Sequence, residues 1–151
     1  MVTVVSHSRN DTELLGKRLG GTLGGGEVIA FFGGLGMGKT VMTSGIALGM
    51  GLDAKISSPT FALVHEHYNA DAKAAALCHF DMYRVSGFDD LASTGFFDYL
   101  DNGSVLCIEW SENIREFLPQ DCIKIEIQRG DTDDDRILTL TGDKKYEAAW
   151  N

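Results

Sequence analysis

The segment GGLGMGKT at residues 33–40 limits the possible fold more than any other part of the sequence. It fits the P-loop pattern G-x-x-x-x-G-K-[ST] at every fixed position. The apolar run VIAFF precedes it at residues 28–32, and residues 39–50 read as a helix that ends before Gly51. A short apolar run is typical of a buried strand, and glycine is favoured directly after a helix. The order of strand, glycine-rich loop and helix predicts an α/β fold.

The residue types of this loop suit the binding of a nucleoside triphosphate. Glycines adopt backbone conformations closed to other residues and let main-chain N–H groups approach phosphate oxygens. The helix N-terminus adds the positive end of its dipole. Lys39 can reach the β- and γ-phosphates, and the Thr40 hydroxyl can ligate Mg²⁺. We therefore expect Mg²⁺ and ATP, which is favoured over GTP because no N/T-K-x-D motif for reading guanine is present.

A magnesium-dependent phosphate site also needs a carboxylate at the end of a neighbouring strand. Asp81 ends the run LCHFD at residues 77–81, and Glu109 ends VLCIE at residues 105–109. An acid at the end of a buried strand faces the edge of the sheet where ligands of α/β proteins bind. One acid can hold the metal through water while the other orients the attacking water. Periodicity does not assign the two roles, and either acid alone reads equally well as a surface residue.

The rest of the chain predicts a single domain over residues 1–151, because it contains no repeat, Pro-rich linker or break in composition. Asn10 and Glu13 form the pattern of a capping box for a helix that runs to about Leu23. The expected fold is a P-loop NTPase-like three-layer sandwich whose sheet mixes parallel and antiparallel strands. The further elements that we expect are strands at 61–68 and 77–81, an antiparallel pair; helices at 88–99 and 111–118; and a hairpin of 123–128 with 136–141 around the acidic turn 131–135.

Composition and charge exclude several classes of function. The net charge of −9 and the pI of about 4.7 argue against a protein that holds nucleic acid by itself, since such binding needs a basic surface. No apolar run approaches the length that spans a bilayer, and no signal peptide is evident. The three cysteines lie far apart in apolar runs, which indicates reduced thiols within strands. We expect a cytoplasmic protein with no membrane contact.

Four motifs together resemble the bacterial TsaE family, also called YjeE. They are GGLGMGKT, SPTFALVHEHY at residues 58–68, HFDMYR at residues 79–84 and IEW at residues 108–110, within a resemblance that covers roughly residues 5–140. The resemblance implies the small ATPase of tRNA threonylcarbamoyladenosine synthesis, with the protein partners TsaD and TsaB. In that family, ATP hydrolysis resets the TsaD–TsaB complex, which transfers a threonylcarbamoyl group to an adenosine beside the anticodon. The tRNA is then contacted only indirectly, mainly through the other subunits.

The same resemblance implies roles for individual residues. Thr40 would ligate Mg²⁺ directly and Glu109 through water, while Asp81 would lie near the γ-phosphate and order the attacking water. Thr60 would sense the γ-phosphate, so that the implied catalytic residues are Lys39, Asp81 and Thr60. Arg9 aligns with the contact to the nucleotide base. The remaining implied nucleotide contacts are Gly33, Leu35, Gly36, Met37, Gly38, Lys39, Thr40 and Val41.

The sequence departs from the family at Gly34, where an acidic or other polar residue is usual. A cradle built from backbone N–H groups does not need that side chain.

Two other functions fit the phosphate site. A small-molecule P-loop kinase would need an acceptor site and a lid bearing arginines, and no lid is obvious in the sequence. A nucleotide-gated binding module would bind ATP with little hydrolysis. We expect His79 to be a strand residue whose ring nitrogens are hydrogen-bonded, rather than a catalyst. The sequence does not decide whether Trp110 is a core residue, a partner contact or a platform on which the base stacks.

Overall fold

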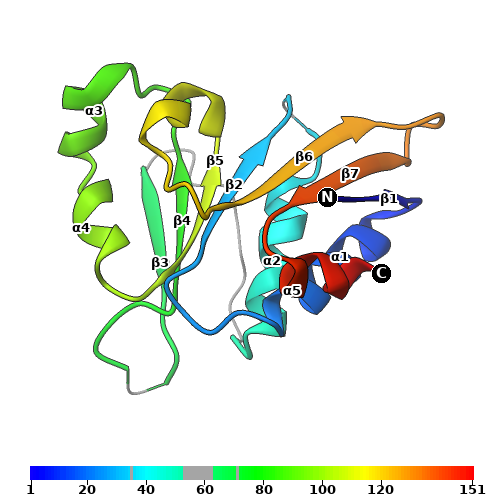
Figure 1. The fold of residues 1–151 in the computed structure, drawn as a ribbon, viewed down its shortest axis with the longest axis horizontal. Helices are drawn as coiled ribbons and strands as arrows, with labels where there is room; N and C mark the ends of the chain where they lie inside the picture. The colour runs from blue at the N-terminus through cyan, green and yellow to red at the C-terminus, as the bar shows by residue number, and fades with distance from the viewer. Residues whose placement is uncertain (35, 53–62, 71) are drawn as a thin grey trace.

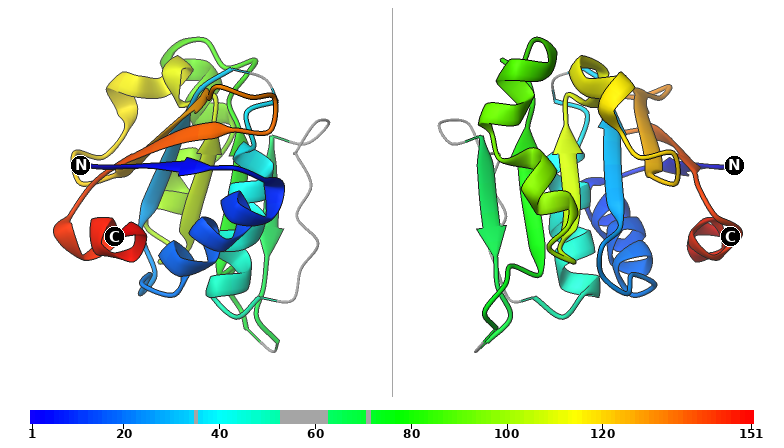
Figure 2. Two further views of the ribbon diagram at one scale, coloured as in Figure 1. Left: turned by 90° about the vertical axis from the view of Figure 1, so that its right-hand side faces the viewer. Right: turned by 60° about the vertical axis from the view of Figure 1, so that its left-hand side comes forward.

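The computed structural model describes residues 1–34, 36–52, 63–70 and 72–151, which form an α/β domain around one sheet (Figure 1). Helices cover both faces of the sheet, so the layers are helix, sheet and helix (Figure 2). The elements in chain order are β1 (Val2–Ser6), α1 (Arg9–Gly20), β2 (Val28–Phe32), α2 (Lys39–Gly49), β3 (Val64–His67), β4 (Leu77–Asp81), α3 (Gly87–Ser93), α4 (Phe96–Leu100), β5 (Val105–Glu109), η1 (Ser111–Phe117), β6 (Ile123–Arg129), β7 (Arg136–Thr141), α5 (Lys144–Glu147) and η2 (Ala148–Trp150).

The strand order across the sheet is β1-β7-β6-β2-β5-β4-β3. The four central strands β6, β2, β5 and β4 run parallel to one another, whereas β3 pairs antiparallel with β4, β7 with β6, and β1 with β7. The mixed sheet predicted from the sequence is confirmed, as are the antiparallel pair of β3 with β4 and the hairpin of β6 with β7. Every residue of β2 and β5 is buried, as expected for parallel strands covered on both faces.

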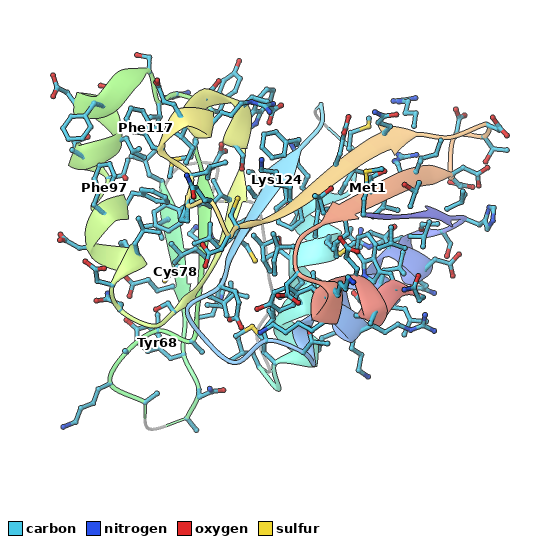
Figure 3. The ribbon with its side chains drawn as sticks, viewed as in Figure 1. Met1, Tyr68, Cys78, Phe97, Phe117 and Lys124 are labelled. Atoms are coloured by element: carbon cyan, nitrogen blue, oxygen red, sulfur yellow. The ribbon has the colours of Figure 1, made fainter. Side chains whose placement is uncertain are left out.

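Two hydrophobic clusters fill the space between the layers. Alternate residues of the central strands point to opposite faces, so Ile29 and Phe31 join one cluster with α1 and α2, while Val28 and Ala30 join the other. The second cluster lies under α3, α4 and η1, where Phe97 and Phe117 pack with ring centroids 6.5 Å apart (Figure 3). Among the helices that the structure describes, none combines the length and apolar character that crossing a bilayer requires.

The first helix begins two residues earlier than the sequence pattern indicates. Ser8, rather than Asn10, is the N-cap, because its hydroxyl accepts from the N–H of Asp11 at 3.1 Å. The carboxylate of Asp11 in turn accepts from the N–H of His7 at 3.0 Å. These reciprocal bonds satisfy N–H groups at the helix start, as a capping box does. The proposed box of Asn10 with Glu13 is wrong, because Asn10 already lies inside the helix.

Other boundaries also differ from the expectation. The helix expected at 88–99 is two helices, α3 and α4, because Gly95 adopts a left-handed conformation (φ 79°) between them. The strand expected at 61–68 is observed as β3, and its residues 61 and 62 lie outside the described residues. The three cysteines are free and buried, as expected, although Cys122 lies just before β6 rather than within a strand.

The N-terminal and C-terminal segments form elements that the sequence analysis did not predict. β1 is an edge strand that pairs with β7, from Val2 with Leu140 to Ser6 with Arg136. The C-terminal α5 and η2 pack beside α1, where the indole N–H of Trp150 donates to the carbonyl of Leu15 at 2.9 Å. Both ends of the chain therefore hold α1 in place.

Glycines bring α1 and α2 into backbone contact. A Cβ added at Gly16 or Gly20 of α1 would lie 2.5 or 2.2 Å from a carbonyl oxygen of α2. A Cβ at Gly45 or Gly49 of α2 would lie 2.1 Å from a carbonyl oxygen of α1. No side chain fits at these positions, so the two helices approach as closely as their backbones allow. The N-terminus of α1 is thereby fixed beside the N-terminus of α2.

We expect Gly45→Ala to destabilise the protein by about 1–3 kcal/mol, because the new methyl group would push α1 away from α2. The gain in helix propensity, about 1 kcal/mol, offsets only part of this cost. The measurement is the midpoint of urea unfolding. Gly21→Ala is the matched control, since its Cβ would lie 3.6 Å or more from its neighbours at a right-handed φ of −67°. Equal midpoints for the two variants would contradict the close contact.

Candidate functional site

The loop between β2 and α2 closes tightly over the end of the sheet. Gly33 has a φ of 136°, and a Cβ there would lie 2.5 Å from the carbonyl oxygen of Ile127 on β6. Gly38 is the N-cap of α2 with a φ of 98°. Neither position accepts a side chain without strain, so the backbone requires glycine at positions 33 and 38. Leu35, between them, lies outside the described residues.

Lys39 begins α2 and is almost fully buried, with 4% of its surface exposed. Its Nζ donates to the carbonyl oxygen of Gly33 at 3.0 Å and lies 4.7 Å from the centroid of the Trp110 ring. Tyr83 packs against the same indole at 4.9 Å between centroids. A buried ammonium group therefore lies within the glycine loop, where it can meet an anion.

The two candidate acids end neighbouring parallel strands, β4 and β5, and are paired in register. The Glu109 carboxylate is buried, and its Oε2 lies 3.5 Å from the Thr40 hydroxyl and 2.5 Å from Nε2 of His79. Asp81 is half-buried, and its Oδ1 accepts from the N–H of Tyr83 at 2.9 Å. The structure therefore brings Thr40 and Glu109 into contact, with Asp81 on the adjacent strand.

The donor set fits Mg²⁺ bound together with phosphate. Thr40 and Glu109 offer hard oxygen atoms 3.5 Å apart, and Mg²⁺ at phosphate sites takes few protein ligands and keeps several waters. In the described ranges, no group of three or more His, Cys, Asp or Glu residues is arranged to hold a metal by itself. A metal at this place would accordingly depend on the nucleotide for part of its coordination.

A cavity of about 210 Å³ adjoins the loop on the side of α1. Arg9, at the start of α1, lies on its wall beside Met37 and Val41, as a contact to the nucleotide base would require. Three separate segments line the cavity, and two of them carry its charged groups. Its lining residues are Ser8, Arg9, Thr12, Gly36, Met37, Gly38, Val41, Asp133, Asp134 and Arg136.

The acidic turn supplies a wall of this cavity that the sequence analysis missed. Asp133 and Asp134 are exposed, as expected for a solvated turn, yet they also line the cavity. Arg136 links the turn to the loop, because its guanidinium donates to the carbonyl of Asp133 at 2.7 Å and to that of Gly36 at 3.4 Å. Figure 1 shows the β6–β7 turn reaching the same end of the molecule as the β1–α1 connection. No local pattern signals this long-range contact.

Hydrogen bonds hold the connection between β1 and α1 in place beside the cavity. The buried Ser6 hydroxyl bonds the Thr12 hydroxyl at 2.7 Å and donates to the carbonyl of Ser8 at 2.8 Å. Nδ1 of His7 lies 2.8 Å from the carboxylate of Asp135 in the acidic turn. This hydrogen bond lowers the pKa of the Asp135 carboxyl. The connection and the turn are therefore tied together beside the loop.

Some of the predicted site falls outside the described residues. This applies to Thr60 with the whole segment 58–61, and to Leu35. The structure assembles the other predicted nucleotide contacts around one loop: Gly33, Gly36, Met37, Gly38, Lys39, Thr40, Val41 and Arg9.

A central parallel strand, a glycine loop and a helix N-terminus with a buried lysine define the P-loop class of α/β domains. The sequence profile described as "Threonylcarbamoyl adenosine biosynthesis protein TsaE" matches residues 6–138. The chain belongs to this TsaE family.

Individual relatives agree with the family match. The protein named "tRNA threonylcarbamoyladenosine biosynthesis protein TsaE" from Mycobacterium tuberculosis is 36% identical over 134 residues, covering 85% of this chain and 80% of that protein. The protein of the same name from Bacillus subtilis is 36% identical over 123 residues, covering 81% and 74%. The crystal structure of Bacillus subtilis YdiB superposes with a TM-score of 0.73 at 28% identity, covering 99% of this chain and 90% of that one. The predicted fold is confirmed by this similarity.

We expect Gly33→Ala to destabilise the protein by about 1–3 kcal/mol, because its methyl group would collide with β6 at a φ that alanine rarely adopts. The measurement is again the urea midpoint. Gly34→Ala is the control, since a Cβ at position 34 would meet nothing within 4 Å. Equal destabilisation by Gly34→Ala and Gly33→Ala would contradict the close approach of Gly33 to β6.

Proposed function

We propose that this protein is a Mg²⁺-dependent ATPase that acts with TsaD and TsaB in tRNA threonylcarbamoyladenosine synthesis. Hydrolysis would reset the TsaD–TsaB complex between turnovers, and the tRNA would be held mainly by the other subunits. The observation that carries the proposal is the meeting of Lys39, Thr40 and Glu109 at the glycine loop. A cation, a hydroxyl and a carboxylate at a helix N-terminus form the set that P-loop ATPases use.

Different residues would bind the phosphates, the Mg²⁺ ion and the nucleoside of ATP. Backbone N–H groups at the start of α2 would receive the phosphate oxygens, aided by the helix dipole. Lys39 would exchange its bond to the Gly33 carbonyl for one to the β- and γ-phosphates, where it would stabilise the charge that develops during transfer. Thr40 and Glu109 would hold Mg²⁺, which when bound neutralises charge on the same phosphates. The cavity lined by Arg9, Met37 and Val41 would take the nucleoside.

Asp81 is the residue that we propose for water activation. It ends β4 beside Glu109, and its bond from the N–H of Tyr83 fixes one carboxylate oxygen. The other oxygen could accept a hydrogen bond from a water that attacks the γ-phosphorus. The bond between the γ-phosphorus and the β–γ bridging oxygen then breaks, ADP leaves, and the proton of the water passes to phosphate or to the Asp81 carboxylate. Such positioning of a nucleophile typically contributes a factor of about 10²–10⁴.

We expect Lys39→Ala to raise the dissociation constant for ATP at least about tenfold and to abolish phosphate release, because the phosphates lose their buried cation. Binding is measured by titration calorimetry and hydrolysis by release of inorganic phosphate. Lys17→Ala removes an exposed lysine from the last turn of α1 and is the control. Unchanged affinity and turnover in a folded Lys39→Ala variant would refute the site.

We expect Asp81→Asn to lower phosphate release by about 10²-fold or more while ATP affinity stays near that of the wild type. Phosphate release is measured for the protein alone and with TsaD–TsaB, which should stimulate the wild type. A variant that still docks and supports tRNA modification at the normal rate would favour the nucleotide-gated binding module. A phosphorylated small molecule in place of free phosphate would identify a kinase.

A further inference from the structure

His79 is a buried polar residue that the proposed mechanism leaves without a role. It lies in β4 with 0% of its surface exposed, two residues before Asp81. Its register neighbours are His65 on β3 and Cys107 on β5. Burying an imidazole is costly unless its nitrogen atoms find partners. In the part of the chain that the structure describes, Nδ1 has no hydrogen-bond partner, so Nε2 makes the one contact on which the residue depends.

That contact is with the carboxylate of Glu109, whose Oε2 lies 2.5 Å from Nε2 of His79. An ionised carboxylate can only accept hydrogen bonds, so the ring proton belongs on Nε2 and the imidazole donates. The bond joins two side chains that are both buried, and it crosses from β4 to the adjacent β5. This hydrogen bond from β4 restricts the rotation of the Glu109 side chain.

The same carboxylate oxygen lies 3.5 Å from the Thr40 hydroxyl at the start of α2. Glu109 is thus held between β4 and the P-loop helix, by His79 on one side and Thr40 on the other. Carboxylates that serve metals are commonly oriented by a hydrogen bond from a second side chain. His79 stands in that relation to Glu109.

We propose that His79 is a positioning residue that orients Glu109 for Mg²⁺ bound with nucleotide. The inference rests on the proposed function, because it requires that Thr40 and Glu109 serve Mg²⁺. Loss of a partner of this kind typically weakens metal affinity by about 10–100-fold. The competing explanation is that His79 only stabilises the sheet. Removing one partner of a buried pair does destabilise a protein, so a loss of stability alone would not distinguish the two explanations.

Two amide substitutions distinguish a role of His79 in positioning Glu109 from a role in stabilising the sheet. The side-chain nitrogen of glutamine is as many bonds from Cβ as Nε2 of histidine, so His79→Gln can still donate to Glu109. The nitrogen of asparagine corresponds to Nδ1, so His79→Asn cannot reach the carboxylate. The experiment measures ATP affinity by calorimetry at fixed Mg²⁺ concentrations and in EDTA, well below the melting temperature of the less stable variant. The readout is the Mg²⁺ concentration that gives half of the metal-dependent gain in affinity.

We expect His79→Asn to need about 10–100-fold more Mg²⁺ than the wild type, and His79→Gln to need no more than about threefold. Affinity in EDTA should be equal in all three proteins, because the glycine loop and Lys39 are unchanged. Equal Mg²⁺ requirements for both variants and the wild type would overturn the proposal. If His79→Asn does not fold, His79→Leu replaces it, because leucine also cannot donate to Glu109. A Mg²⁺ requirement of His79→Leu equal to that of the wild type would then overturn the proposal.

The wild-type protein in the same titrations tests the proposed function separately. If the wild type does not bind ATP, or binds it with no dependence on Mg²⁺, the proposed function fails and the role of His79 fails with it. If the ATP affinity of the wild type depends on Mg²⁺ and both variants need the same Mg²⁺ concentration as the wild type, only the role of His79 fails.

Discussion

The backbone contact between α1 and α2 is the constraint on which the rest of the molecule depends. Four glycines allow it, and each faces a carbonyl group of the opposite helix at a distance that excludes even a methyl group. Because α2 starts at the P-loop, the contact also fixes the start of α1 beside that loop. Ser8 and Arg9 reach the cavity wall for this reason. The edge strand β1 and the indole of Trp150 then hold α1 from both ends of the chain.

The chemistry at the loop depends on a second constraint, the parallel register of β2, β5 and β4. Parallel strands end at the same edge of a sheet, so their terminal side chains meet the N-terminus of the helix that follows the central strand. Glu109 and Asp81 are adjacent because β5 and β4 pair in register, and Thr40 reaches Glu109 because α2 follows β2. Hydrogen bonds hold Glu109 through His79 and Asp81 through the N–H of Tyr83. This would reduce the reorganisation needed for the phosphate binding that we propose.

Local sequence patterns predicted the parts of the site that lie within one strand–loop–helix unit. The P-loop, the strand at 28–32 and the two strand-end acids were all visible, because glycine spacing and apolar runs report local structure directly. The wall formed by Asp133, Asp134 and Arg136 was not, since it requires contact between the acidic turn and the glycine loop, where Arg136 and Gly36 are 100 residues apart. The N-cap was misplaced for a different reason. Ser8 and Asn10 both suit a cap by residue type, and the structure shows that Ser8 takes the position, with its hydroxyl accepting from the N–H of Asp11.

The departure of Gly34 from the family pattern is compatible with the geometry of the loop. Gly33 and Gly38 are fixed by backbone conformation, whereas position 34 is exposed and has open space where a side chain would be. It borders a second cavity, of about 450 Å³, whose lining includes Arg115 and Lys124. A polar side chain at position 34 would therefore contact solvent or a partner protein, and would leave the cradle of N–H groups unchanged. The phosphate binding that we propose and any contact made from position 34 are thus separable properties of one loop.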